Sequence, residues 1–141
     1  MRAFADTDIA VYAESDDGEK SKRARSILES SPVISTQVIN ETIAALKGKY
    51  GFSKPDAYEV AGGLMDLCEV VSVNQGTVRE AMKLAVRYQL SHWDALIVAA
   101  ALETGCDVLY SEDMQHEQVF DGRVTARNPF IEPSGEVAPF V

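Results

Sequence analysis

The sequence has no hydrophobic run long enough to cross a membrane, and few of the residues that mark disulfide or zinc proteins. The longest apolar run, Ala95–Leu102, has eight residues, whereas a membrane-spanning helix needs about 20. The two cysteines, Cys68 and Cys106, are isolated, and the two histidines lack zinc-motif spacing. Because no signal-peptide hydrophobic region precedes Asp6, we expect a cytoplasmic protein with reduced cysteines and no membrane partner.

Positive charge is also scarce in this chain. Its 141 residues include 13 Lys and Arg against 22 Asp and Glu, which gives a net charge of −9. A protein that binds nucleic acid by charge complementarity alone should be basic. A role on nucleic acid would therefore need metal ions that neutralise phosphate, or a local basic patch. Solubility alone also accounts for the acidity.

What the sequence does contain is an alternation of strand-like and helix-like segments. Short apolar or β-branched segments predict strands at Arg2–Ala5, Val33–Ile34, Glu69–Val73, Asp107–Tyr110 and Val124–Ala126, the last at a sheet edge. Apolar residues at helical spacing predict helices at 20–30, 36–47, 54–67, 76–89 and 91–103. This order favours an α/β fold of three layers, with a central, mainly parallel sheet of four to five short strands.

The length corresponds to about one domain. We expect that domain to span residues 1–130. The segment that begins at Pro129 is rich in Pro and Gly, which predicts little regular structure. Residues 131–141 are therefore expected to form a loosely ordered C-terminal tail.

Acidic residues stand where a parallel sheet places its functional site, at the carboxyl ends of the strands. They either follow a predicted strand directly or lie on the helix after it: Asp6, Glu41, Asp94 and Asp113. Clustered carboxylates repel one another unless a cation lies between them, and oxygen ligands select magnesium or manganese. These ions activate water and neutralise the leaving oxygen in phosphodiester hydrolysis.

Each of these acids also has a purely structural explanation. Asp6 is a good N-cap residue, and Asp94 stands three residues after Ser91, as in a variant capping box. Asp113 suits a turn, and Glu41 suits a helix surface. The joint pattern, rather than any single acid, indicates a metal site.

Four segments resemble the acidic motifs of PIN-domain ribonucleases, most closely those of the VapC toxins of VapBC toxin–antitoxin pairs. They are Phe4–Asp8, Ser35–Glu41, Trp93–Ala101 and Tyr110–Gln115, and the resemblance extends from about residue 3 to 129. It implies a PIN-like fold and cleavage of RNA with Mg²⁺ or Mn²⁺. It also implies a homodimer and a cognate antitoxin protein as partners.

The resemblance assigns roles to individual residues. It implies that Asp6, Glu41, Asp94 and Asp113 are the catalytic, metal-binding carboxylates, and that Ser111 is a supporting hydroxyl. The family commonly has Asn where this chain has Asp8. Asp8 would therefore be either a fifth carboxylate or a replacement hydrogen-bond acceptor.

Candidates for RNA contact are a basic cluster and one aromatic residue. The cluster lies on the predicted helix at 20–30 and comprises Lys20, Lys22, Arg23 and Arg25. Trp93, beside Asp94, could stack on a base. A solvated helix face and ordinary packing are the alternatives, and Tyr12 could line the same groove, an interface or the core.

Two other functions compete with a metal-dependent endoribonuclease of the toxin type. In a haloacid-dehalogenase-like phosphatase, Asp6 would be the nucleophile and Asp8 the general acid. Against this stand Ala10, where that family prefers Thr or Val, and the lack of room for a cap domain. The second alternative is a non-catalytic PIN-like interaction module, which gives no physical reason to keep four like charges together.

Overall fold

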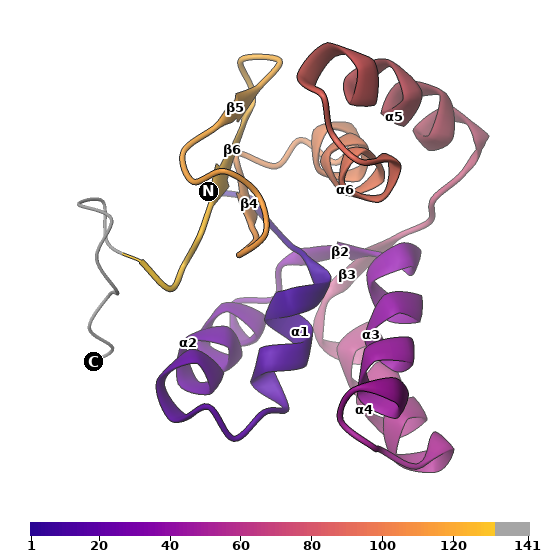
Figure 1. Ribbon diagram of the computed structural model, residues 1–141, viewed down its shortest axis with the longest axis vertical. Coiled ribbons are helices and arrows are strands. Elements are labelled where there is room, and N and C mark those ends of the chain that lie inside the picture. Colours follow the sequence, from indigo (N-terminus) through magenta and orange to yellow (C-terminus); the bar gives the residue numbers. More distant parts are fainter. Residues whose placement is uncertain (132–141) are drawn as a thin grey trace.

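The computed structural model describes residues 1–131 and builds a six-stranded sheet with helices on both faces (Figure 1). The strands are β1 (Ala3–Ala5), β2 (Val33–Ser35), β3 (Glu69–Val71), β4 (Val108–Tyr110), β5 (Val119–Phe120) and β6 (Val124–Arg127). The helices are α1 (Thr7–Ala13), α2 (Gly18–Glu29), α3 (Thr36–Gly48), α4 (Lys54–Leu67), α5 (Gln75–Tyr88) and α6 (His92–Glu103). The predicted α/β class is confirmed.

The strand order, β3-β2-β1-β4-β6-β5, puts β1 in the middle of the sheet. All neighbouring strands pair in parallel except β5, which is antiparallel to β6. Helices α1 to α4 cover one face and α5 and α6 the other (Figure 1), as right-handed crossovers on either side of β1 require. Ala5 at the end of β1 pairs with Tyr110 at the end of β4, so Asp6 and Ser111 leave the sheet side by side.

The helices begin where the sequence places polar caps. Ser35, Ser53, Asn74 and Ser91 are N-cap residues whose side chains accept a backbone N–H from the first turn, which satisfies one of the otherwise unpaired donors. The five helices predicted from spacing all form, each within two residues of the expected bounds. Both cysteines are buried and unpaired, as expected.

The longest apolar run forms the core of α6, where every residue of Ala95–Leu102 is buried. This helix contacts the sheet through β2, β4 and β6 and is covered on its outer side by α5. A helix with neighbours on two sides is apolar all round rather than amphipathic. No helix in residues 1–131 is long and apolar enough to cross a membrane.

Two elements were not predicted, α1 and β5. Helix α1 has seven residues, four of them buried (Ile9, Ala10, Val11 and Ala13), which is too short a segment for helical periodicity to be recognised in the sequence. Strand β5 forms an edge hairpin with β6 across Asp121 and Gly122, which both adopt positive φ. An Asp-Gly pair is a known hairpin signal. The prediction of 124–126 as an edge strand is wrong, because β5 lies outside it and gives the sheet one strand more than expected.

Phe130, the last residue of the domain expected at 1–130, packs against the rest of the protein. Phe130 is only 2% exposed and packs edge-to-face on Tyr12, with 5.2 Å between ring centroids. An edge-to-face aromatic pair adds stabilisation beyond its buried area, so this contact holds the segment after β6 against α1. The remainder of the expected tail, residues 132–141, lies outside the described residues.

Candidate active site

Asp6 occupies the centre of the site, at the point where β1 ends and α1 begins. Its side chain is buried, and its two carboxylate oxygens accept hydrogen bonds from the Thr7 N–H (2.7 Å) and the Ser111 hydroxyl (2.8 Å). Burial raises the pKa of Asp6 to about 6, since these two bonds offset burial only in part and the charges of Asp94 and Asp113 add to the rise. Asp6 is therefore both the N-cap of α1 and a carboxylate that faces other carboxylates.

Ser111 connects Asp6 to Asp113. Its hydroxyl donates to Asp6 and accepts from the Asp113 N–H at 3.2 Å. The hydroxyl is fully buried, so its orientation is fixed by these two bonds. Ser111 thus links Asp6, at the end of β1, to Asp113, in the loop after β4.

Asp94 approaches the same place from the other face of the sheet. It lies in the first turn of α6, where its N–H donates to the Ser91 hydroxyl at 3.1 Å. Burial raises the pKa of Asp94, and the negative charge of Asp113 raises it further. These shifts indicate that Asp6, Asp94 and Asp113 interact electrostatically.

Glu41 lies on α3, the helix that follows β2. It is exposed, and one oxygen accepts a hydrogen bond from the Gln37 amide nitrogen at 2.6 Å. The same nitrogen donates to the Trp93 carbonyl at 3.1 Å. Gln37 thereby links Glu41 on α3 to the start of α6.

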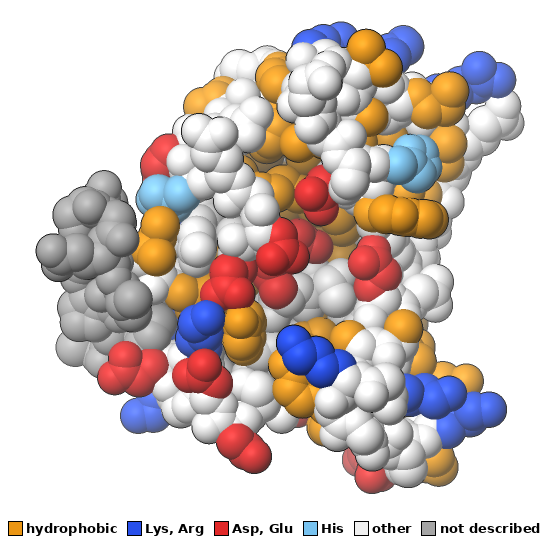
Figure 2. Space-filling view, viewed as in Figure 1, with side chains coloured by type: hydrophobic (Ala, Val, Ile, Leu, Met, Phe, Trp, Pro, Cys, Tyr) orange, Lys and Arg blue, Asp and Glu red, His pale blue; other side chains and the backbone are white. Residues whose placement is uncertain are grey.

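The acidic side chains line one cleft of about 320 Å³. Figure 2 shows acidic side chains gathered in the hollow at the middle of this face. The polar and aromatic side chains that line the cleft include Asp6, Asp8, Tyr12, Gln37, Glu41, Lys49, Tyr50, Trp93, Asp94, Glu112 and Asp113. The four carboxylates expected to converge therefore open into one space.

Within residues 1–131, no three acidic, His or Cys side chains lie close enough to form a ready-made metal site. The donors nevertheless suit a hard divalent cation, because all of them are oxygens. One oxygen of Asp8 is buried without a hydrogen-bond partner, and Asp6 keeps a raised pKa among like charges. A cation in the cleft would relieve both conditions, so the residues fit such an ion.

Asp8 is the position where the family pattern and this chain differ. Its other oxygen accepts the Glu112 N–H at 2.9 Å, so Asp8 does act as an acceptor. Burial, reinforced by the charge of Asp6, raises the pKa of Asp8 to about 8. Asp8 thus combines the two expected roles: an acceptor for the loop after β4 and an additional acid in the cleft.

The four basic residues of α2 do not form one surface toward the cleft. Lys20 is paired with Glu112 at 2.6 Å, and the Arg25 guanidinium donates to the Ala13 carbonyl at 3.0 Å. Arg23 lies beside a separate cavity that includes Met1 and Tyr110, and Lys22 is exposed. Their contact with RNA remains a prediction.

The cleft also contains residues that sequence reasoning missed. Lys49, just after α3, is the basic residue among those that line the cleft in the described chain, and Tyr50 lies beside it. Gln37 and Glu112 make the contacts given above. Gln37 lies in the Ser35–Glu41 segment, four residues before Glu41. Residues four apart share a helix face, so this spacing could have identified Gln37 as a neighbour of Glu41. No local pattern marks Lys49.

The sequence itself identifies the family, because the PIN domain model matches residues 3–120. The chain belongs to the PIN domain family. No curated protein matches it in sequence. The sheet order and the acidic cleft are therefore those of a PIN domain.

Several solved structures resemble the chain in fold. Mycobacterium tuberculosis VapC20, a sarcin–ricin loop cleaving toxin, superposes with a TM-score of 0.66 at 21% identity, over 79% of this chain and 89% of its own. A toxin–antitoxin complex from Klebsiella pneumoniae gives 0.68 at 21% identity, over 91% and 98%. DNA-bound VapBC from Salmonella typhimurium gives 0.66 at 15%, over 89% and 98%. At these identities the similarity establishes the fold.

Proposed function

We propose that this chain is a metal-dependent endoribonuclease and the toxin subunit of a toxin–antitoxin pair. The observation that carries the proposal is the cleft into which Asp6, Glu41, Asp94 and Asp113 open from separate elements. Membership of the PIN family and similarity to VapC toxins support it. One similar toxin cleaves the sarcin–ricin loop, which supports RNA as the substrate class.

Asp6, Glu41, Asp94 and Asp113 would hold Mg²⁺ or Mn²⁺, which when bound supplies activation of water and neutralisation of phosphate charge. The protein contributes the fixed orientation of these carboxylates. Ser111 and the Thr7 N–H hold both oxygens of Asp6, and Gln37 holds Glu41. The cleft walls then position the RNA strand so that one phosphodiester faces the carboxylates.

The decisive test is metal-dependent cleavage with defined ends. Purified chain is incubated with total RNA in Mn²⁺ or Mg²⁺, with EDTA as the control, and the ends are sequenced. We expect discrete cuts that leave a 5′-phosphate and a 3′-hydroxyl and that disappear with EDTA. Ends that carry a 2′,3′-cyclic phosphate would reject this chemistry.

Lys49 is expected to contact an RNA phosphate. For a single-stranded nucleic acid, the loss of one phosphate contact makes the plot of log K against log salt concentration less steep by about 0.7. We expect Lys49→Ala to weaken RNA binding several-fold with that change in slope, measured by fluorescence anisotropy. Lys47, in the last turn of the same helix and outside the cleft, provides the control: an equal effect of Lys47→Ala would refute a specific role for Lys49.

Trp93 is expected to stack on a base next to the cut. Its side chain is 65% exposed at the rim of the cleft, and base–aromatic stacking contributes about 1–3 kcal/mol. Trp93→Ala should therefore raise KM for RNA about tenfold and leave Tm almost unchanged, while Trp93→Phe retains most of the affinity. Tyr58→Ala, which removes an exposed ring on α4, should change neither quantity.

The antitoxin partner belongs to the same proposal. The similar structures include toxin–antitoxin complexes, and an acidic cleft suits an arginine that pairs with carboxylates. A short neighbouring reading frame whose product binds this chain and stops cleavage would support the toxin role. A homodimer and a cytoplasmic location remain predictions, which sedimentation and cell fractionation would check.

Of the alternatives, the haloacid-dehalogenase-like phosphatase is wrong, because the chain belongs to the PIN family. The non-catalytic PIN module differs from the proposed nuclease in one measurable property. It should bind Mn²⁺ no more tightly than a variant in which Asp94 is replaced by Asn.

A further inference from the structure

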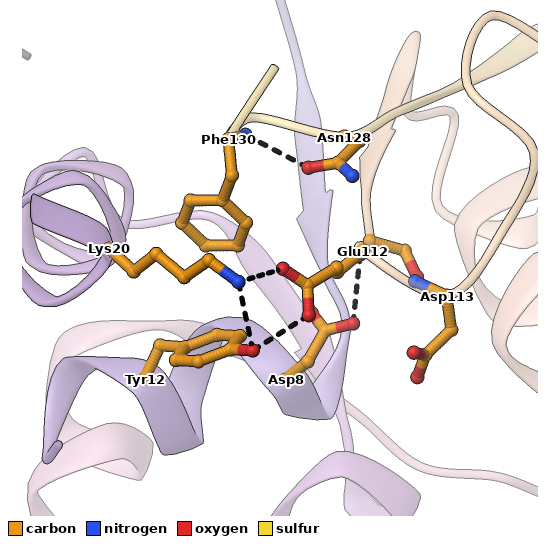
Figure 3. Close-up of polar contacts among 8 residues, drawn as sticks. Asp8, Tyr12, Lys20, Glu112, Asp113, Asn128 and Phe130 are labelled. Atoms are coloured by element: carbon orange, nitrogen blue, oxygen red, sulfur yellow. Dashed lines mark hydrogen bonds and ion pairs between the residues drawn. The ribbon is translucent and has the colours of Figure 1, made fainter. Parts of the chain in front are cut away.

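Glu112 connects the loop after β4 to helices α1 and α2 (Figure 3). Its backbone N–H donates to Asp8 at 2.9 Å. Its carboxylate accepts the Tyr12 hydroxyl at 2.7 Å with one oxygen and the Lys20 ammonium at 2.6 Å with the other. One residue is thus held by α1 through two side chains and by α2 through a third.

Lys20 is itself held in place by aromatic rings. Its ammonium lies 4.7 Å from the centroid of the Tyr12 ring and 5.5 Å from that of Phe130. Phe130 is kept there by the bond from its N–H to the Asn128 side chain at 2.9 Å. A lysine that is partly withdrawn from water beside two rings and a carboxylate has little freedom to move.

The neighbours of Glu112 in the chain are the residues that build the site. Ser111 bonds to Asp6, and the Asp113 N–H bonds to Ser111. A shift of Glu112 would therefore move Asp113 and release Asp8. Both carboxylate oxygens of Glu112 are engaged, one by the Tyr12 hydroxyl and the other by the Lys20 ammonium.

We propose that Glu112, clamped by Lys20 and Tyr12, is a positioning residue that fixes the 111–113 loop so that Asp8 and Asp113 face the cleft. In this role Lys20 acts through Glu112 and not by contact with RNA. The inference rests on the proposed function for its activity readout only, because the position of the loop can be measured without metal or substrate.

The test compares Lys20→Met with Arg87→Met. Arg87 pairs with Asp121 at 2.7 Å, and the Tyr88 hydroxyl donates to the same carboxylate at 2.8 Å. The control therefore removes a positive charge from another group of a base, a tyrosine and an acid, which lies outside the cleft. Three quantities are measured: amide hydrogen exchange in metal-free protein, the Kd for Mn²⁺ by calorimetry, and kcat and KM on RNA. Lys20→Arg, which keeps the charge and the donors, should behave as wild type.

For Lys20→Met we expect the Glu112 and Asp113 amides to exchange at least tenfold faster. Loss of a residue that orients metal ligands typically costs 10- to 100-fold in affinity or activity, so the Kd for Mn²⁺ should rise and kcat should fall by about tenfold, with KM unchanged. Arg87→Met should alter none of these. Tyr12→Phe should show a smaller change in the same direction.

Other outcomes separate the two hypotheses. If Lys20→Met raises KM and leaves exchange, Mn²⁺ affinity and kcat unchanged, Lys20 contacts RNA and the positioning role is refuted. If wild type neither binds Mn²⁺ nor cuts RNA, the proposed function fails, and the exchange rates of Glu112 and Asp113 still decide whether Lys20 fixes the loop.

Discussion

Replacing Asp94 by Asn should reduce RNA cleavage about 1,000-fold and leave the protein folded. The substitution removes one negative charge from the metal site without changing the size of the side chain. A bound ion stabilises the charge of the transition state by several kcal/mol. Each loss of about 1.36 kcal/mol lowers the rate tenfold. The charges of Asp6 and Asp113 face Asp94 across the cleft, so its loss relieves repulsion in the metal-free protein. Single-turnover cleavage and a thermal melt measure the two effects.

The chain provides a matched control at Asp56. Asp56 follows the N-cap Ser53 by three residues on α4, and its N–H donates to the Ser53 hydroxyl at 3.2 Å, as Asp94 does to Ser91 at 3.1 Å. Asp56 is exposed and outside the cleft. Asp56→Asn should keep full activity. Equal losses of Tm with no loss of cleavage in either variant would mean that Asp94 serves α6 alone.

The fold could be predicted where a local physical rule determines it. Three helices begin after a serine whose hydroxyl accepts an N–H of the first turn, namely Ser35, Ser53 and Ser91, and serine is a preferred N-cap residue. Helix α1 escaped prediction because its seven residues are fewer than the roughly 11 or more over which helical periodicity can be recognised. Strand β6 lies inside the sheet because β5 pairs with it across a tight Asp-Gly turn. The Asp-Gly pair is a hairpin signal, but β5 has only two residues, too few to predict a strand from its own pattern.

The central part of the site followed from one topological rule. Parallel strands that lie side by side end at the same edge, so Asp6 and Asp113 had to approach one another once β1 and β4 paired. The sequence could not show that Lys20 pairs with Glu112, 92 residues away, because a charge pair between distant segments has no local pattern. The basic cluster on α2 therefore suggested a single RNA surface, whereas the structure gives Lys20 and Arg25 separate partners.

Asp8 leads to the second large effect, a stability that falls as pH rises. The pKa values of Asp6 and Asp8 in the folded chain are about 6 and about 8, against 3.8 as the ordinary value. Between those limits the folded state binds more protons than the unfolded state, and each such group lowers the free energy of unfolding by about 1.4 kcal/mol per pH unit. Both groups act from about pH 4 to 6, and Asp8 alone acts from about pH 6 to 8.

Asp8→Asn isolates this contribution, since an amide oxygen can still accept the Glu112 N–H. In metal-free buffer the variant should match wild type in Tm near pH 4, and its advantage should grow up to about pH 8 and then level off. Mg²⁺ added at pH 8 should raise the Tm of wild type more than that of the variant, because a cation that binds the ionised acids favours the folded state. Asp66→Asn, at an exposed position of α4, should show neither trend. A Tm difference between Asp8→Asn and wild type that stays constant from pH 4 to 8 would mean that Asp8 is ionised throughout that range. Its unpaired oxygen would then be accessible to water and would not need a cation.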